Sequence, residues 1–179
     1  MTNAFTYNAQ EYGNGSLLGP ALESWQGPSL YVYNDATFTE RDFQNLAKVG
    51  QGSKLDKLAA TGRFGLGFNA VYHFTDLPSF VTGDHLVVFD PHTKYLPGAT
   101  SSQPGIKVRF ADTDLLAQFP DQFSPYVFFG CDLKSRFEGT LFRFPLRSPV
   151  IARDSEISQA SYTPAAVMEL LGQFKEAAN

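Results

Sequence analysis

Residues 62–74 read GRFGLGFNAVYHF, in which three glycines lead directly into an apolar segment compatible with a helix. A glycine-rich entry to a helix leaves backbone N–H groups uncovered at the positive end of the helix macrodipole, where a phosphate group can bind. The spacing G-x-x-G-x-G matches neither the dinucleotide fingerprint nor the lysine-containing P-loop. The stretch therefore supports two hypotheses: a nucleotide-phosphate site, or a tight turn from a loop into a helix.

The chain of 179 residues has the length and composition of one globular domain. It is 43% hydrophobic and 18% charged, and its longest apolar runs are far too short to span a bilayer. The net charge of −4 argues against a nucleic-acid surface, which needs clustered Lys and Arg. We expect a cytoplasmic protein with neither a nucleic acid nor a membrane as partner.

Cysteine and histidine give no sign of a metal site or of a disulfide. Cys131 is the single cysteine and follows two phenylalanines closely, so it is expected to be buried and chemically quiet. His73, His85 and His92 lie at no spacing typical of zinc ligands, and structural or surface roles are expected for them. The chain contains no G-x-S-x-G elbow, which disfavours a hydrolytic triad.

Strand patterns recur along the chain, and its seventeen Phe and eight Tyr favour a broad sheet covered by helices. Strands are predicted at residues 5–7 (an edge strand), 29–33, 79–82, 85–89, 106–110 and 139–146. The segments 79–82 and 85–89 form a hairpin around Gly83-Asp84.

Helix signals separate these strands. The sequence Thr39-Glu40-Arg41-Asp42 resembles a capping box and predicts a helix that ends near Gly50. Residues 16–27 are expected to form an apolar irregular stretch or a short helix, and residues 115–119 a short helix. Thr163-Pro164 predicts the start of a C-terminal helix. Residues 51–61 are expected to form a mobile loop over a site, 120–130 an insertion packed on the sheet edge, and 147–161 a surface linker.

Asp35 stands directly after the strand predicted at 29–33 and before the capped helix. A carboxylate at this place suits binding chemistry, and it is also a favoured turn residue. In the last predicted strand, Gly139 and Thr140 stand at the entry, where the backbone can approach a ligand closely.

The order of these motifs resembles that of the GHKL ATPase family, which includes gyrase, the ninety-kilodalton heat-shock chaperone, histidine kinases and MutL. The resemblance is closest to the sacsin-type, chaperone-like ATPase domain. It covers about residues 16–148 and rests on segments 27–40, 62–76, 83–84, 89–92 and 139–147. It implies a Bergerat-type α/β two-layer sandwich, with a mixed, largely antiparallel sheet and helices on one face. Residues 1–28 would be an N-terminal extension, 149–162 a linker and 163–179 a C-terminal helix.

The resemblance also implies an adenine-nucleotide site for ATP or ADP. Asp35 is similar to the family aspartate that accepts the adenine amino group, and Thr140 to the threonine that completes the adenine contact. The glycine motif corresponds to the phosphate loop, formed by Gly62, Arg63, Phe64, Gly65, Leu66, Gly67 and Phe68. Chaperones or client proteins are the implied partners. The alternative function is a degenerate scaffold that binds no nucleotide and mediates protein interactions in proteostasis.

Two departures from the family pattern bear on hydrolysis. The family's D-x-G-x-G is replaced here by Asp35-Ala36-Thr37-Phe38-Thr39. The helix that carries the family's glutamate base and Mg²⁺-binding asparagine is not found in residues 1–28, so the resemblance implies a domain that starts late, without a Mg²⁺ ligand. We therefore expect impaired ATP hydrolysis, and exposed apolar surface around Leu17, Leu18 and Trp25.

Overall fold

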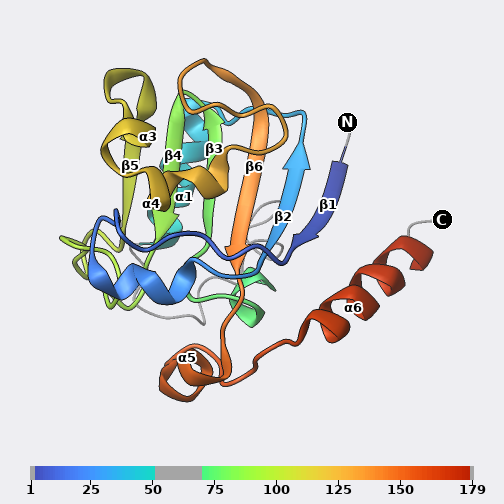
Figure 1. The fold of residues 1–179 in the computed structure, drawn as a ribbon. Coiled ribbons are helices and arrows are strands. Elements are labelled where there is room, and N and C mark those ends of the chain that lie inside the picture. Colours follow the sequence, from blue (N-terminus) through green and yellow to red (C-terminus); the bar gives the residue numbers. More distant parts are fainter. Residues whose placement is uncertain (1–2, 51–69, 178–179) are drawn as a thin grey trace.

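The computed structural model describes residues 3–50 and 70–177 (Figure 1). Within these ranges six strands form one open sheet in the order β1-β2-β6-β3-β4-β5, and every neighbouring pair is antiparallel. The strands are β1 (Asn3–Asn8), β2 (Ser29–Asn34), β3 (Ser79–Gly83), β4 (His85–Phe89), β5 (Gly105–Arg109) and β6 (Phe137–Pro145). The predicted α+β sandwich is confirmed, with its two longest helices on one face of the sheet as expected, but shorter helices also cover the other face.

Strand β6 lies in the middle of the sheet although it comes last in the sequence. It pairs with β2 on one side and with β3 on the other, so that Thr140 is opposite both Asn34 and Thr82. Because side chains alternate along a strand, Thr140 and Phe142 share one face of the sheet with Thr82 and Phe80. We call this side the α1 face.

The α1 face is covered by α1 (Glu40–Gly50), η3 (Ala70–His73) and α6 (Pro164–Ala177). Phe43 of α1 packs against Phe80 at 6.4 Å and against His85 at 5.3 Å between ring centroids. Over β2 and β6, Val71 of η3 and Val167 of α6 join a second apolar cluster with Leu30, Phe144 and Leu146. The capping box is confirmed, because the Thr39 N–H donates to Asp42 Oδ2 and the Asp42 N–H donates back to Thr39 Oγ1.

Short helices cover the opposite face of the sheet (Figure 1). They are η1 (Pro20–Trp25), η4 (Phe110–Asp112), α3 (Leu115–Gln118), α4 (Pro120–Phe123) and η5 (Ser124–Tyr126). Residues 120–130 were expected at the sheet edge, and this is wrong: the Tyr126 hydroxyl donates to Ser79 Oγ (2.8 Å) and the Tyr31 hydroxyl donates to the Pro125 carbonyl (2.8 Å). The segment therefore lies over inner strands, because its tyrosine and proline groups satisfy polar atoms of the sheet face.

The expected exposure of Trp25 is also wrong. Trp25 is 1% exposed and packs edge-on against Tyr95 at 5.0 Å, while Leu17 and Leu18 are half-buried against the same core. The physical reason lies in Gln26, whose side-chain amide donates to the carbonyls of Gly13 and Asp121. These bonds hold η1 against the sheet, so its apolar side chains are covered.

Residues 147–161 differ from a polar surface linker. They contain α5 (Pro149–Asp154), capped by Ser148 Oγ, which accepts from the Ile151 N–H at 3.2 Å. Ile151 and Ala152 are buried, and Arg147 is 1% exposed. Although the composition of this segment is polar, it contains two buried apolar residues and one buried charge.

Cys131 is buried and unpaired, as the sequence predicts. Burial raises the pKa of the Cys131 thiol to about 11. We expect iodoacetamide to alkylate the folded protein at pH 8 at least about 100-fold more slowly than the protein unfolded in guanidinium, because the thiolate is the reacting species. Mass spectrometry of timed samples measures both rates, and equal rates in the two states would contradict the burial of Cys131.

Among the described residues, no helix combines the length and apolarity needed to cross a lipid bilayer.

Candidate functional site

Asp35 and Thr140, the two residues predicted to contact adenine, lie close together. Asp35 follows directly after β2 and is exposed. On one side of it, Asn34 is the ladder partner of Thr140. On the other side, the Ala36 carbonyl accepts a hydrogen bond from the Thr140 hydroxyl at 2.7 Å. The β6 strand thus fixes the main chain on both sides of Asp35.

Thr82 completes this polar cluster, and no motif in the sequence singles it out. Its Oγ1 lies 2.9 Å from Thr140 Oγ1 and accepts the Phe38 N–H at 3.0 Å. Both threonines are buried, with exposed fractions of 0–1%. Two hydroxyls of the sheet therefore hold the segment from Ala36 to Phe38 at the end of β2. The hairpin places Thr82 in a strand, but no local signal shows that this strand lies beside β6.

An aromatic surface adjoins the cluster on the α1 face. Phe38 contacts Phe80 at 4.8 Å and Phe142 at 6.4 Å, and Phe80 contacts Phe142 at 5.4 Å between ring centroids. Phe80 is fully buried, so the half-buried rings of Phe38 and Phe142 are the part of this surface that a purine could contact, and Asp35 offers an acceptor for a purine amino group.

Gly139 is required where β6 passes the end of β2. Its φ is +146°, and a Cβ built there would lie 2.6 Å from the Asn34 carbonyl oxygen and 2.8 Å from Tyr33 Cε2. The backbone of β6 therefore approaches that of β2 more closely than any side chain allows, one residue before Thr140. The group approached in the structure is the chain's own β2, and the expected approach to a ligand at this position stays a prediction.

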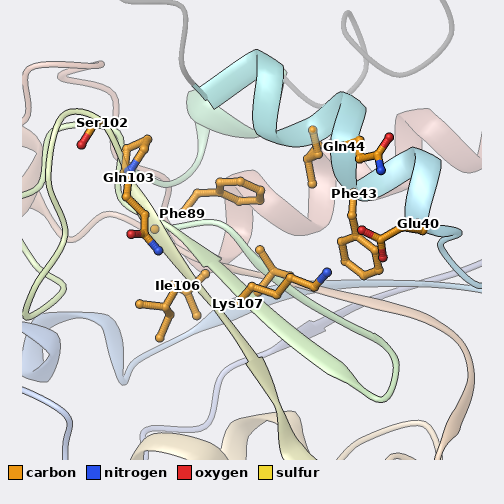
Figure 2. A pocket seen from close by; sticks show the side chains of 13 residues that line it. Glu40, Phe43, Gln44, Phe89, Ser102, Gln103, Ile106 and Lys107 are labelled. Carbon is orange, nitrogen blue, oxygen red and sulfur yellow. The ribbon is translucent and has the colours of Figure 1, made fainter.

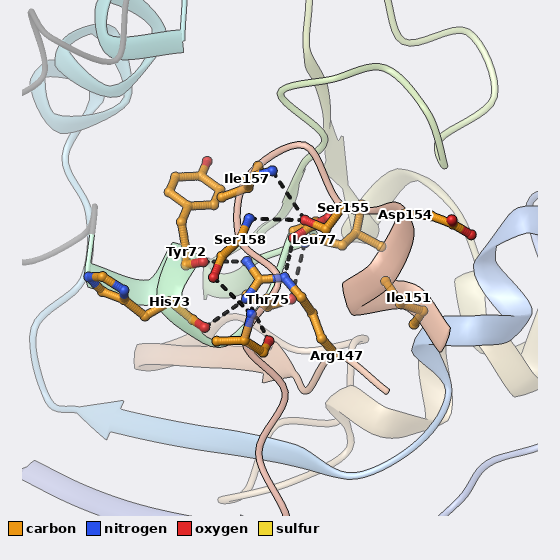
Figure 3. Close-up of polar contacts among 12 residues, drawn as sticks. Tyr72, His73, Thr75, Leu77, Arg147, Ile151, Asp154, Ser155, Ile157 and Ser158 are labelled. Atoms are coloured by element: carbon orange, nitrogen blue, oxygen red, sulfur yellow. Dashed lines mark hydrogen bonds and ion pairs between the residues drawn. The ribbon is translucent and has the colours of Figure 1, made fainter. Parts of the chain in front are cut away.

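Arg147 joins the end of β6 to the segment that follows the glycine motif in the sequence (Figure 3). Its Nε donates to Asp76 Oδ1 at 2.5 Å, and its terminal nitrogens donate to the carbonyls of His73 (2.7 Å) and Tyr72. The Arg147 side chain is completely buried and that of Asp76 is 6% exposed. One guanidinium thus satisfies a buried carboxylate and the carbonyls at the end of η3.

Asp90, which belongs to the motif at residues 89–92, has a structural role. Its buried carboxylate accepts the N–H groups of Lys94, Tyr95 and Leu96 at 2.7–3.1 Å and so shapes the loop after β4.

Burial raises the pKa of the Tyr95 hydroxyl to about 12, with smaller contributions from the Asp76 and Asp90 carboxylates. Tyr95 is therefore a neutral hydrogen-bond donor near neutral pH.

The remaining predicted site residues, Gly62, Arg63, Phe64, Gly65, Leu66, Gly67 and Phe68, lie outside the described residues, as does most of the expected lid at 50–61. Their contact with phosphate stays a prediction. Within residues 3–50 and 70–177, no three His, Cys, Asp or Glu side chains gather closely enough to hold a metal ion.

Comparison with known proteins gives two consistent results. The sequence model of the Sacsin domain family matches residues 2–179. The chain is also similar to Sacsin of Homo sapiens, with 44% identity over 172 residues. This match covers 96% of the chain and 4% of the human protein, so the chain spans a small fraction of this relative's length. The chain belongs to the Sacsin domain family.

Proposed function

We propose that this domain binds an adenine nucleotide and acts as a chaperone-like module of the sacsin type. The observation that carries the proposal is the position of Asp35, an exposed carboxylate between two residues that Thr140 contacts. The GHKL resemblance, in which Asp35 matches the adenine-binding aspartate, supports the same reading. Chaperones and client proteins are the proposed partners.

The residues present fit the adenine end of such a nucleotide. Asp35 would accept a hydrogen bond from the adenine amino group, and the half-buried rings of Phe38 and Phe142 would contact the purine ring. Thr140 would act mainly through the main chain, because its hydroxyl already donates to the Ala36 carbonyl. The phosphates would bind the glycine motif at residues 62–68, as the sequence predicts, and Mg²⁺ would accompany them.

We also propose that this domain hydrolyses ATP only weakly. Glu11 and Glu23 are the acidic residues that precede β2. Glu23 belongs to η1 on the face opposite α1, and its carboxylate accepts the Asn14 side-chain amide at 2.7 Å. Glu11 is exposed and lies outside any helix or strand. Neither carboxylate belongs to a helix on the α1 face, where the GHKL resemblance requires the base that activates water.

Replacement of Asp35 with alanine tests the proposal. We expect the affinity for ATP to fall about 5- to 150-fold, because a desolvated acceptor for the adenine amino group contributes about 1–3 kcal/mol. Titration calorimetry of ATP binding to both proteins measures the ratio. Asp154→Ala, which removes another exposed aspartate in α5, is the matched control and should bind like the parent. Equal ATP affinity of Asp35→Ala and parent would refute the role of Asp35.

One observation favours the scaffold alternative. Thr140 is fully buried, and its hydroxyl is already engaged with Ala36 and Thr82, so the contact expected between this hydroxyl and adenine is filled by the protein itself. A domain that has lost nucleotide binding would show this arrangement. If the parent shows no ATP or ADP binding at millimolar concentration, the scaffold hypothesis replaces the proposal of nucleotide binding.

A further inference from the structure

A groove runs between α1 and the β5 edge of the sheet, at the far end from β1 (Figure 2). Its volume is about 310 Å³. Apolar side chains, including Phe43, Val87 and Phe89, line its interior, and polar ones, including Glu40, Gln103 and Lys107, stand around it. The nucleotide site proposed above does not use these side chains.

Some backbone N–H and C=O groups of β5 bond to β4, and the others point out of the sheet at this edge. The Asp90 N–H donates to the Pro104 carbonyl at 2.8 Å and the Phe110 N–H donates to the Asp84 carbonyl at 3.0 Å. In an antiparallel ladder hydrogen-bonded and non-hydrogen-bonded pairs alternate, so Ile106 and Val108 also bond to β4. The N–H and C=O groups of Gly105, Lys107 and Arg109 consequently point away from β4. Among the described residues no strand pairs with that side of β5.

The side chains at the edge add charge to this backbone pattern. Lys107 Nζ lies 3.8 Å from the centroid of the Phe43 ring, and no carboxylate of the described residues lies within ion-pair distance of it. Gly105 stands two positions before Lys107 and pairs with Phe89 of β4. Because Gly105 has no side chain, it leaves the groove open beside Phe89. A strand laid along β5 would thus meet an apolar hollow and, two residues further along, a cation.

We propose that the outer edge of β5 binds an extended peptide as an added strand. The N–H and C=O groups of Gly105, Lys107 and Arg109 pair with the peptide backbone. Because side chains on one face of a strand recur every two residues, one peptide side chain enters the groove beside Phe89, and the side chain two positions away faces Lys107. The peptide therefore carries an aliphatic or aromatic residue and an acidic residue separated by one position. The peptide contacts none of the residues proposed for the nucleotide.

Backbone hydrogen exchange with a defined peptide tests the proposal. The probe is acetyl-Ser-Thr-Leu-Thr-Glu-Thr-Ser-amide, and the matched control peptide has Lys in place of Glu. We expect the amides of Lys107 and Arg109 to exchange rapidly in the free protein and those of Ile106 and Val108 slowly. Saturation with the probe should slow the exchange of Lys107 and Arg109 at least about tenfold, as expected for newly formed backbone hydrogen bonds.

A proline at position 107 separates edge pairing from other modes of binding. Lys107→Pro removes an outward N–H, which edge strands tolerate, and should lower the affinity for the probe at least about tenfold by fluorescence anisotropy. Lys107→Ala keeps the N–H and should retain measurable binding, with the preference for the acidic peptide over its lysine control lost. A thermal melt shows that each variant is folded.

Three outcomes would overturn the proposal. The first is an unchanged exchange rate of Lys107 and Arg109 in the presence of the probe at millimolar concentration. The second is equal binding of the probe by folded Lys107→Pro and by the parent. The third is protection of these amides that rises with protein concentration in the absence of peptide, because the occupant would then be a second copy of this chain.

Discussion

Replacing Arg147 with methionine is expected to lower the free energy of unfolding by about 3–5 kcal/mol, the usual cost of removing one partner of a buried ion pair. The methionine fills similar volume but leaves the Asp76 carboxylate and the Tyr72 and His73 carbonyls without their donor. Unsatisfied buried polar groups each lose their solvation without compensation. Urea denaturation monitored by circular dichroism measures the change.

Three further variants isolate the cause. Arg153→Met, which replaces an exposed arginine of α5, should leave stability within about 0.5 kcal/mol of the parent. Arg147→Lys should be intermediate, because a single ammonium cannot match the fork of donors that the guanidinium presents. The double variant Arg147→Met with Asp76→Leu should recover part of the loss, since it removes the uncompensated carboxylate. A loss below about 1 kcal/mol for Arg147→Met would show that the buried pair does not stabilise the fold.

Gly139→Ala is expected to destabilise the protein by about 2–5 kcal/mol, although alanine is the smallest possible addition. Two effects combine at this position. A non-glycine residue at φ +146° is strained by about 1–3 kcal/mol. The new Cβ would also lie 2.6 Å from the Asn34 carbonyl oxygen, which forces β2 and β6 apart.

Gly130 offers a matched control for Gly139. It also has a positive φ, +82°, but no atom lies within 4 Å of the position of its Cβ. Gly130→Ala should therefore show the strain alone, and Gly27→Ala, with neither strain nor contact, should be nearly neutral. Thermal unfolding of the three variants ranks them. Equal losses for Gly139→Ala and Gly130→Ala would mean that the close approach of β6 to β2 is not constrained by this glycine.

Local elements were determined by the sequence itself. The β-branched and aromatic run at 29–33 predicted β2, the turn at Gly83-Asp84 predicted the β3–β4 hairpin, and Thr39 with Asp42 predicted the start of α1. These signals are readable because the interactions that they describe join residues close in the chain. The place of Asp35 directly after a strand was visible in the same way, while its contact with adenine stays a prediction. The phosphate role of the glycine motif stays a prediction.

Only the tertiary structure decided which distant segments meet. Thr140 lies 58 residues from Thr82 and 104 from Ala36 in the sequence, and the cluster forms because β6 inserts between β2 and β3. Arg147 stands in a polar stretch typical of a surface, and its burial depends on Asp76, 71 residues away. A charge can be buried only where partners satisfy it, and local periodicity carries no information about such partners. The sequence therefore determined the elements and the carboxylate at Asp35, whereas the pairing of strands determined what surrounds it.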